Sequence, residues 1–230
     1  MLGVKPVSDL RCGRRAGIGD QLKKVLTVRT ILKEDRRQQI VANSTNEIFT
    51  VNVSEFTAAI KDMSAGDRIL LSGDIYTARD AAHKKIFALI EQGGELPFDI
   101  RGAVIYYAGP TPGGARPIGS CGPTTSGRMD AFSPMLYDMG LAATVGKGER
   151  SPDVCNAIVK NKAAYLCAIG GAGALISKHI SAAHEIAFPE LGCESIKQLT
   201  VTMMPLIVGI DCHGGDLFKT GRESYARNIM

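Results

Sequence analysis

Short, unbroken apolar runs between turn residues dominate the second half of the chain. Three of them, residues 141–145, 164–169 and 206–210, are typical of strands buried on both faces of a sheet. A fourth run, at residues 103–107, is rich in β-forming side chains and ends at Ala-Gly-Pro-Thr-Pro-Gly-Gly. Residues 67–71 and 75–77 form two further extended pieces. The pattern therefore predicts a sheet made of several short strands.

Two segments between these runs have helical patterns. Residues 78–92 place four apolar side chains on one face, and Gly93-Gly94 ends the segment. Ser133-Pro134 predicts a second helix, with Ser133 as its cap and Pro134 at its first position. Strands and helices thus alternate, which predicts an α/β protein: a mixed sheet with helices packed against it. Ligands of such sheets gather in the loops at strand ends.

The basic charge lies in an N-terminal arm. Residues 1–46 hold ten Lys and Arg against four Asp and Glu, whereas residues 47–230 hold seventeen against nineteen. The arm contains a possible amphipathic helix starting near Asp20, either a docking or linker helix or a targeting peptide. We divide the chain into a basic arm, residues 1–46, and one domain, residues 47–230.

Composition excludes several classes of protein. Apolar residues make up 45% and charged residues 22% of the chain, as in globular proteins. The faintly acidic domain has no Trp and no basic patch interleaved with aromatics, so we expect no nucleic-acid partner. No apolar run reaches the length of a membrane span, and no secretory signal is visible, so a cytoplasmic protein is expected. Six scattered cysteines show no metal-ligand spacing, so no metal site is expected.

The densest chemical signal is the segment 119–130, which contains Gly122, Thr124, Thr125 and Arg128. Glycines allow a ligand to approach the backbone, and hydroxyls offer donors. A helix starting here would direct free amides at an anion, and an arginine fork matches a carboxylate or phosphate. The segment is either such an anion site or a capped loop with incidental hydroxyls.

A second group begins the helix predicted at 78–92. Arg79 and His83 are four residues apart, so both side chains are expected on one face near a strand end. Arginine binds carboxylates and histidine moves protons near neutral pH. Alternatively, Asp80 favours the helix dipole and His83 is a half-buried structural residue.

Lys147 stands between two glycines directly after a predicted strand, where it either reaches into a crevice or lies in an exposed turn. The run 170–174 lacks the GxGxxG spacing of a dinucleotide site, and its small residues favour close packing. Residues 211–216 crowd one turn, so we expect no metal there.

Arg79, Arg128 and Lys147 together would suit a dianion such as a dicarboxylate. Adding or removing water beside a carboxylate also needs an electrophile, and side chains alone rarely supply it. The chain shows no residues for that part of the reaction.

At these motifs the chain resembles a known family. The segments LSGDIYTARDAAH, IYYAGP, GPTTSGRMD, GKGER, GGAGAL, LGCESI and IDCHGGDLF occur in the order seen in the β subunit, or carboxy-terminal domain, of class I fumarate hydratases, a family that includes the L-tartrate dehydratase β subunit. The resemblance covers roughly residues 47 to 217.

The resemblance implies a swivelling β/β/α domain of an iron-sulfur hydro-lyase. It implies that a separate α subunit holds a [4Fe-4S] cluster, that this chain holds none, and that the two form a heterotetramer. Arg79, Arg128 and Lys147 match positions that bind substrate carboxylates, with Gly122 and Thr125 in the same loop. Thr124 matches the proposed base that takes the C3 proton, and His83 matches a histidine sometimes assigned to the active site, so the proton acceptor is either of these two.

The resulting hypothesis is a fumarase β subunit that hydrates fumarate reversibly to L-malate. Tyr-Thr-Ala-Arg and Tyr-Ala-Gly-Pro look like the fumarase versions of these motifs. A tartrate or mesaconate dehydratase β subunit is the first alternative. A non-catalytic dicarboxylate-binding module is the second.

Overall fold

The computed structural model describes residues 48–226. The helix expected in the arm and the boundary at residue 46 lie outside this range. The strands of the described part are β1 (Ile48–Asn52), β2 (Arg68–Thr77), β3 (Val104–Tyr106), β4 (Ala143–Gly146), β5 (Ala164–Cys167), β6 (Ile180–Ala187) and β7 (Ile196–Ile210). They form one mixed sheet, as predicted.

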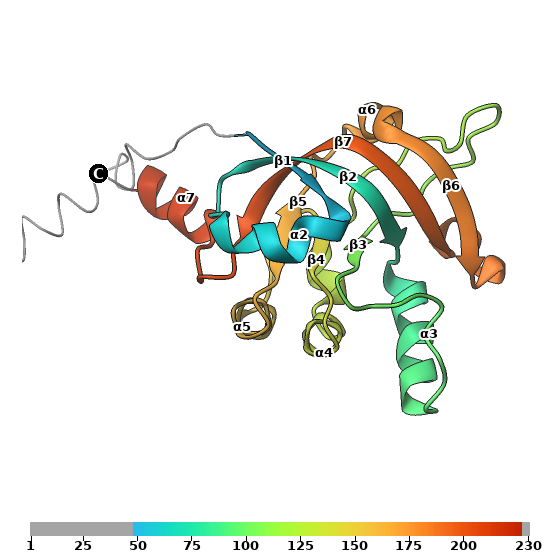
Figure 1. Cartoon of the computed structure of the whole chain (residues 1–230), viewed down its shortest axis with the longest axis horizontal. Helices are drawn as coiled ribbons and strands as arrows, with labels where there is room; N and C mark the ends of the chain where they lie inside the picture. The colour runs from blue at the N-terminus through green and yellow to red at the C-terminus, as the bar shows by residue number, and fades with distance from the viewer. Residues whose placement is uncertain (1–47, 227–230) are drawn as a thin grey trace, which may run out of the picture. The chain divides into compact units, whose positions relative to one another are not determined.

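The sheet closes on itself through its two longest strands, which curve past each other in Figure 1. The strand order is β1-β2-β3-β4-β5-β7-β6, and β2 also pairs with β7. Strands β2, β3, β4, β5 and β7 therefore form a closed, barrel-like ring, with β1 and β6 attached at its sides. Strands β2 to β5 run parallel, and β7 is antiparallel to both of its ring neighbours.

Six α-helices accompany the sheet in this range: α2 (Val53–Ala59), α3 (Asp80–Glu91), α4 (Ser133–Asp138), α5 (Pro152–Lys160), α6 (Gly173–Ile176) and α7 (Leu217–Ala226). Short 3-10 helices cover Ile60–Asp62 (η1), Ser126–Met129 (η2), Ser177–His179 (η3) and Pro189–Glu194 (η4). Helices α3, α4 and α5 lie on the same side of the sheet (Figure 1).

Alternate residues of the short strands face two separate cores. In β3, Val104 and Tyr106 belong to one buried cluster, and Ile105 belongs to the cluster that also contains residues of α3, α4 and α5. In β5, Leu166 faces the first cluster and Tyr165 the second. This confirms that the unbroken apolar runs are strands buried on both faces.

Several local predictions differ from the structure. Ile169, expected at the end of a buried strand, is 63% exposed in the loop after β5. The extended pieces at 67–71 and 75–77 are one strand, β2, with a register irregularity against β7 between Leu71 and Gly73. The capping role of Ser133 is wrong: the cap position is Phe132, and the Ser133 hydroxyl donates back to the Met129 carbonyl.

Candidate functional site

The carboxyl ends of four parallel strands meet at one edge of the ring. Strands β2, β3, β4 and β5 end at this edge, and the segments that follow them begin at Ala78, Tyr107, Lys147 and Ala168. Three of the motifs singled out in the sequence therefore start at the same edge. Ligands bind at the carboxyl ends of parallel strands in open sheets and in closed barrels alike.

The loop 122–128 is held over these strand ends by backbone hydrogen bonds. The Thr124 amide donates to the Tyr107 carbonyl at 2.7 Å, and the Ser126 amide donates to the Lys147 carbonyl at 2.9 Å. The Lys147 amide donates in return to the Thr124 carbonyl at 3.2 Å. These bonds bring Thr124 and Thr125 beside Lys147, although the residues are far apart in the sequence.

The expectation that a helix start in this loop would offer free amides is only partly met. The helix there is η2, a single 3-10 turn of four residues. The amides of Cys121, Thr124 and Ser126 already donate to backbone carbonyls. Side chains rather than a helix terminus therefore supply most of the positive charge at the site.

Asp80, the first residue of α3, joins the two arginines singled out in the sequence. Its Oδ2 lies 3.2 Å from Arg79 Nε, and its Oδ1 lies 3.3 Å from Arg128 Nε. Arg79 Nη2 is also 3.5 Å from Oε1 of Glu194, at the end of η4. The structure thus brings Arg79 and Arg128 together across one carboxylate.

Arg128 also contacts the hydroxyl group of Thr124. Its Nη2 donates to Thr124 Oγ1. Thr124 is half-buried, whereas the Thr125 and Arg128 side chains are exposed. A cation placed on this hydroxyl stabilises its deprotonated form.

His83 is buried and contacts the backbone of Arg79. Its side chain is fully buried, with its ring near those of Tyr107 and Phe132. Nδ1 lies 3.0 Å from the Arg79 carbonyl, and because a carbonyl oxygen only accepts, Nδ1 carries the proton. Nε2 is buried without a hydrogen-bond partner. Burial lowers the pKa of His83 to about 4, although the bond to Arg79 opposes this shift. At neutral pH the ring is therefore uncharged, and its place differs from the shared face expected with Arg79.

Lys147 directly follows β4 and is exposed. A methyl group on Gly170 would lie 3.5 Å from its Cδ and 3.8 Å from its Nζ, so the side chain extends along the Gly170-Gly171 loop. No ion pair of Lys147 lies within residues 48–226. Its ammonium group is thus available at the same edge as the two arginines.

Sequence reasoning missed the partners of the two arginines. From the sequence, Asp80 was expected only to favour the helix dipole, and Glu194 was only part of the motif LGCESI. Sequence reasoning also missed Arg150, whose fully buried guanidinium donates to Asp130 at 2.7 Å and to Ser133 at 2.6 Å. Asp80 and Glu194 could have been found from the sequence, because both are acidic residues inside the motifs and acidic residues pair with arginines.

Close packing at Gly146 joins β4 to the loop. A methyl group there would lie 2.0 Å from Ser126 Oγ and 3.1 Å from a ring carbon of Tyr107. The Ser126 hydroxyl is itself buried and lies 3.0 Å from the Tyr165 hydroxyl. Only glycine fits at the end of β4 without displacing the loop that carries Thr124 and Arg128.

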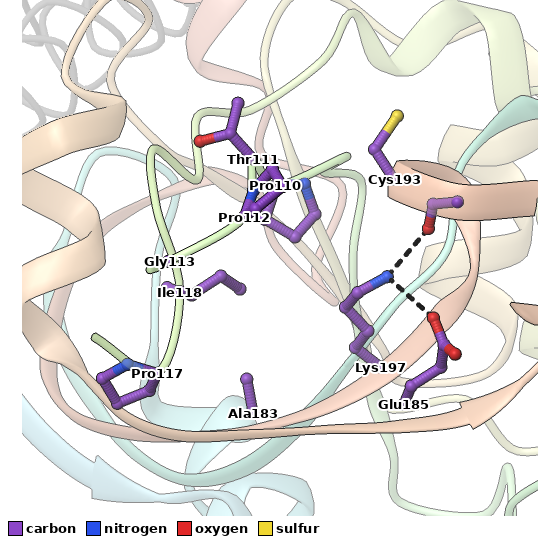
Figure 2. A pocket seen from close by; sticks show the side chains of 11 residues that line it. Pro110, Thr111, Pro112, Gly113, Pro117, Ile118, Ala183, Glu185, Cys193 and Lys197 are labelled. Carbon is purple, nitrogen blue, oxygen red and sulfur yellow. Dashed lines mark hydrogen bonds and ion pairs between the residues drawn. The ribbon is translucent and has the colours of Figure 1, made fainter. Parts of the chain in front are cut away.

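A separate cavity of about 460 Å³ is lined by none of Arg79, Arg128 and Lys147. Figure 2 shows the Lys197 side chain pointing into it, with prolines of the loop 110–117 opposite. The Lys197 ammonium donates to the Gly192 carbonyl at 3.0 Å and lies 3.5 Å from Glu185. The positive charge at this cavity is therefore already paired.

The motif at residues 211–216 is a structural turn. The Asp211 carboxylate accepts hydrogen bonds from the amides of Ala65, His213 and Gly215, each at 2.8 Å. Among residues 48–226, no three His, Cys, Asp or Glu side chains converge as metal ligands. Nor is any helix in this range long and apolar enough to cross a membrane.

Comparison with known proteins identifies the family. Residues 26–221 match the family described as Fumarase C-terminus. The chain belongs to this family. The resemblance stated from the motifs is thereby confirmed, and the match starts at residue 26, within the segment that sequence analysis placed outside the resemblance.

Relatives in the fumarase C-terminal family carry two kinds of name. The anaerobic class I fumarate hydratase of Escherichia coli K12 is 39% identical over 174 residues, which are 73% of this chain and 31% of that protein. Fumarate hydratase 2 of Leishmania major is 40% identical over 158 residues, 67% of this chain and 28% of that protein. A putative L(+)-tartrate dehydratase subunit beta of Methanocaldococcus jannaschii is 35% identical over 167 residues, 70% of this chain and 86% of that protein. The chain thus spans less than a third of these fumarate hydratases but most of the dehydratase subunit.

Proposed function

We propose that this chain is the β subunit of an iron-sulfur hydro-lyase that hydrates fumarate reversibly to L-malate together with a cluster-bearing α subunit. The observation that carries the proposal is the juxtaposition of Arg79, Arg128 and the Thr124 hydroxyl at the edge where β2 to β5 end. Lys147 lies at the same edge. Binding a dicarboxylate calls for cations at both of its ends. Its hydration or dehydration also calls for a group that gives or takes the proton of a carbon atom between the two carboxylates.

In this proposal Arg79, Arg128 and Lys147 bind the substrate carboxylates, and Gly122 and Thr125 line the same loop. Charge-assisted hydrogen bonds of this kind typically contribute about 1.5 to 3 kcal/mol each. Two anchored carboxylates fix the orientation of the carbon atoms between them. The separate cavity is lined by a single cation, Lys197, whereas three cations lie at the edge where β2 to β5 end, so we assign the substrate to the arginine site.

We assign the C3 proton of L-malate to Thr124 rather than to His83. An alcohol is a weak base at neutral pH, and the Arg128 fork on Thr124 Oγ1 would stabilise the alkoxide that it needs. His83 is fully buried, so it touches a ligand at this edge only if the chain moves. We propose that His83 supports the Arg79 backbone through its Nδ1 hydrogen bond.

The departure of the malate hydroxyl needs an electrophile that the described residues do not provide. The cysteines at 121, 155, 167, 193 and 212 do not converge, so a [4Fe-4S] cluster does not fit this part of the chain. We therefore propose that the α subunit holds it, and that the β/β/α domain swivels against that subunit to close the site. The high coverage of the tartrate dehydratase subunit beta supports a separate subunit.

A substrate panel on the assembled complex tests this function. The chain is co-expressed anaerobically with a cluster-bearing α subunit, and turnover of L-malate, fumarate, mesaconate and L-tartrate is measured. We expect fumarate and L-malate to be the preferred pair. A preference for tartrate or mesaconate would assign the chain to that dehydratase instead. Dicarboxylate binding without turnover of any acid would support the non-catalytic module.

A further inference from the structure

Asp80 engages both substrate-binding arginines through the same atom of each fork. Its two oxygens face Arg79 Nε at 3.2 Å and Arg128 Nε at 3.3 Å. Pairing at Nε fixes the plane of a guanidinium and leaves its terminal nitrogens for other acceptors. On Arg128, one of these nitrogens donates to Thr124. On Arg79, Nη2 lies 3.5 Å from Glu194 Oε1, and Nη1 lies beside Gly109, where a methyl group would approach to 3.0 Å.

Capping of α3 does not explain the position of the Asp80 carboxylate. The Ala81 amide, in the first turn of the helix, donates a hydrogen bond to Glu194 Oε2 at 2.9 Å. Glu194 comes from η4, more than a hundred residues later in the chain. Since one Asp80 oxygen faces Arg79 and the other faces Arg128, its carboxylate connects the helix to the loop 122–128.

Electrostatics gives this carboxylate a second effect. Two guanidinium groups held close together repel each other, and a carboxylate between them offsets the repulsion. The same negative charge also opposes the binding of a dianion. If the residue at this position served only to increase the affinity for a dianion, an uncharged side chain would be better. A residue that orients both arginines must instead accept a hydrogen bond from each of them.

We propose that Asp80 is a positioning residue that orients Arg79 and Arg128 as a pair and thereby aims the Arg128 fork at Thr124. The inference rests on the proposed function of this site. Asp80→Asn is the informative substitution, because it keeps the size of the side chain but leaves one oxygen to accept. One arginine then loses its acceptor at Nε, and the negative charge that opposes a dianion disappears.

The first measurement follows the arginines directly in the isolated chain. The ¹⁵N–¹H signals of the Arg79 and Arg128 Nε groups are assigned through Arg79→Lys and Arg128→Lys. We expect Asp80→Asn to shift at least one of the two signals and to speed its exchange with water. The matched control is Asp138→Asn, which removes an exposed carboxylate 2.9 Å from Lys160 and should leave both signals in place. Unchanged arginine signals in Asp80→Asn overturn the inference, whatever the enzyme does.

The second measurement is the kinetics of the assembled complex. We expect kcat of Asp80→Asn to fall about tenfold to hundredfold, as for a small misplacement of a catalytic group, while KM stays equal or falls. A merely structural role would lower thermal stability and raise KM instead. Parent-like kcat together with altered arginine signals overturns the functional half of the inference. A parent complex that turns over no acid of the panel refutes the proposed function, and the arginine signals then decide alone whether Asp80 orients the pair.

Discussion

His83 is the residue for which the structure changes the chemical interpretation most. A histidine four residues after an arginine looked like a candidate acid or base, yet its ring is buried and neutral. Its Nδ1 holds the carbonyl of Arg79, so its contribution to the site is the position of that backbone. Protonation of the buried, unpartnered Nε2 would be unfavourable, because the imidazolium N–H would have no acceptor.

This burial predicts that His83 makes the fold acid-sensitive. Its folded pKa of about 4 lies below the ordinary value of 6.5, so between these values the unfolded chain binds the extra proton. The free energy of unfolding therefore decreases as the pH falls from 6.5 to 4. We expect His83 to account for about 2 kcal/mol of the loss between pH 7 and pH 5. Urea unfolding of the parent and of His83→Asn, which keeps a donor but cannot ionise, measures it.

The pH dependence separates this effect from lost packing. His83→Asn lowers stability at every pH by removing volume, but this loss does not depend on pH. The matched control is His184→Asn on β6, because His184 is exposed. Equal pH dependence of His83→Asn and the parent would show that the buried ring is not the titrating group.

At the scale of elements, the sequence predicted the short strands that are apolar throughout, found only parts of β2 and β7, and missed β1 and β6. Runs buried on both faces identified β3, β4 and β5, because each residue faces a core. Only the last third of β7 was found: its first part alternates polar residues with apolar ones and contains Pro205. Strand β6 has a single buried residue, Ile180, so no apolar run revealed it.

The site was predictable as a set of motifs but not as a set of contacts. Each cation was found in its own segment, because glycines, hydroxyls and charges are visible locally. The bridge from Arg79 through Asp80 to Arg128 depends on the loop 122–128 folding back over the ends of β3 and β4. No single segment of the sequence shows that residues so far apart along the chain will lie side by side.

The junction of β4 with this loop predicts a specific effect of Gly146→Ala. The added methyl would lie 2.0 Å from Ser126 Oγ, so the loop must move. We expect a loss of about 1 to 3 kcal/mol in the free energy of unfolding, typical of overpacking, and at least a tenfold loss of kcat/KM in the complex. Chemical denaturation and steady-state kinetics measure the two effects.

Two further variants test the cause. Gly146→Ala combined with Ser126→Ala removes the nearest atom and should recover part of the stability. Gly221→Ala in α7 is the matched control, because a methyl group there meets nothing within 4 Å. It should leave activity unchanged, and stability equal or slightly higher, as expected for alanine in a helix. A parent-like Gly146→Ala would show that the loop does not depend on this contact.

At the scale of the molecule, the ring of strands presents cations and a hydroxyl at one edge, and residues 48–226 offer no metal site for the hydroxyl that the proposed reaction expels. Two of the five thiols of the described part, those of Cys121 and Cys167, are poorly suited to hold iron, since metal ligation requires the thiolate. Burial raises the pKa of Cys121 to about 12 and that of Cys167 to about 11. The division of labour proposed above follows from this combination.

We therefore predict that the isolated chain, reconstituted anaerobically with iron and sulfide, stays colourless and turns over neither fumarate nor L-malate. The same treatment of the complex with the α subunit should give iron-sulfur absorbance and activity together. Titrating the colourless chain into the α subunit alone should restore activity up to an equal ratio of chains, because each site needs one arginine pair and one cluster. Stoichiometric iron in the isolated chain would place the electrophile here and refute this division.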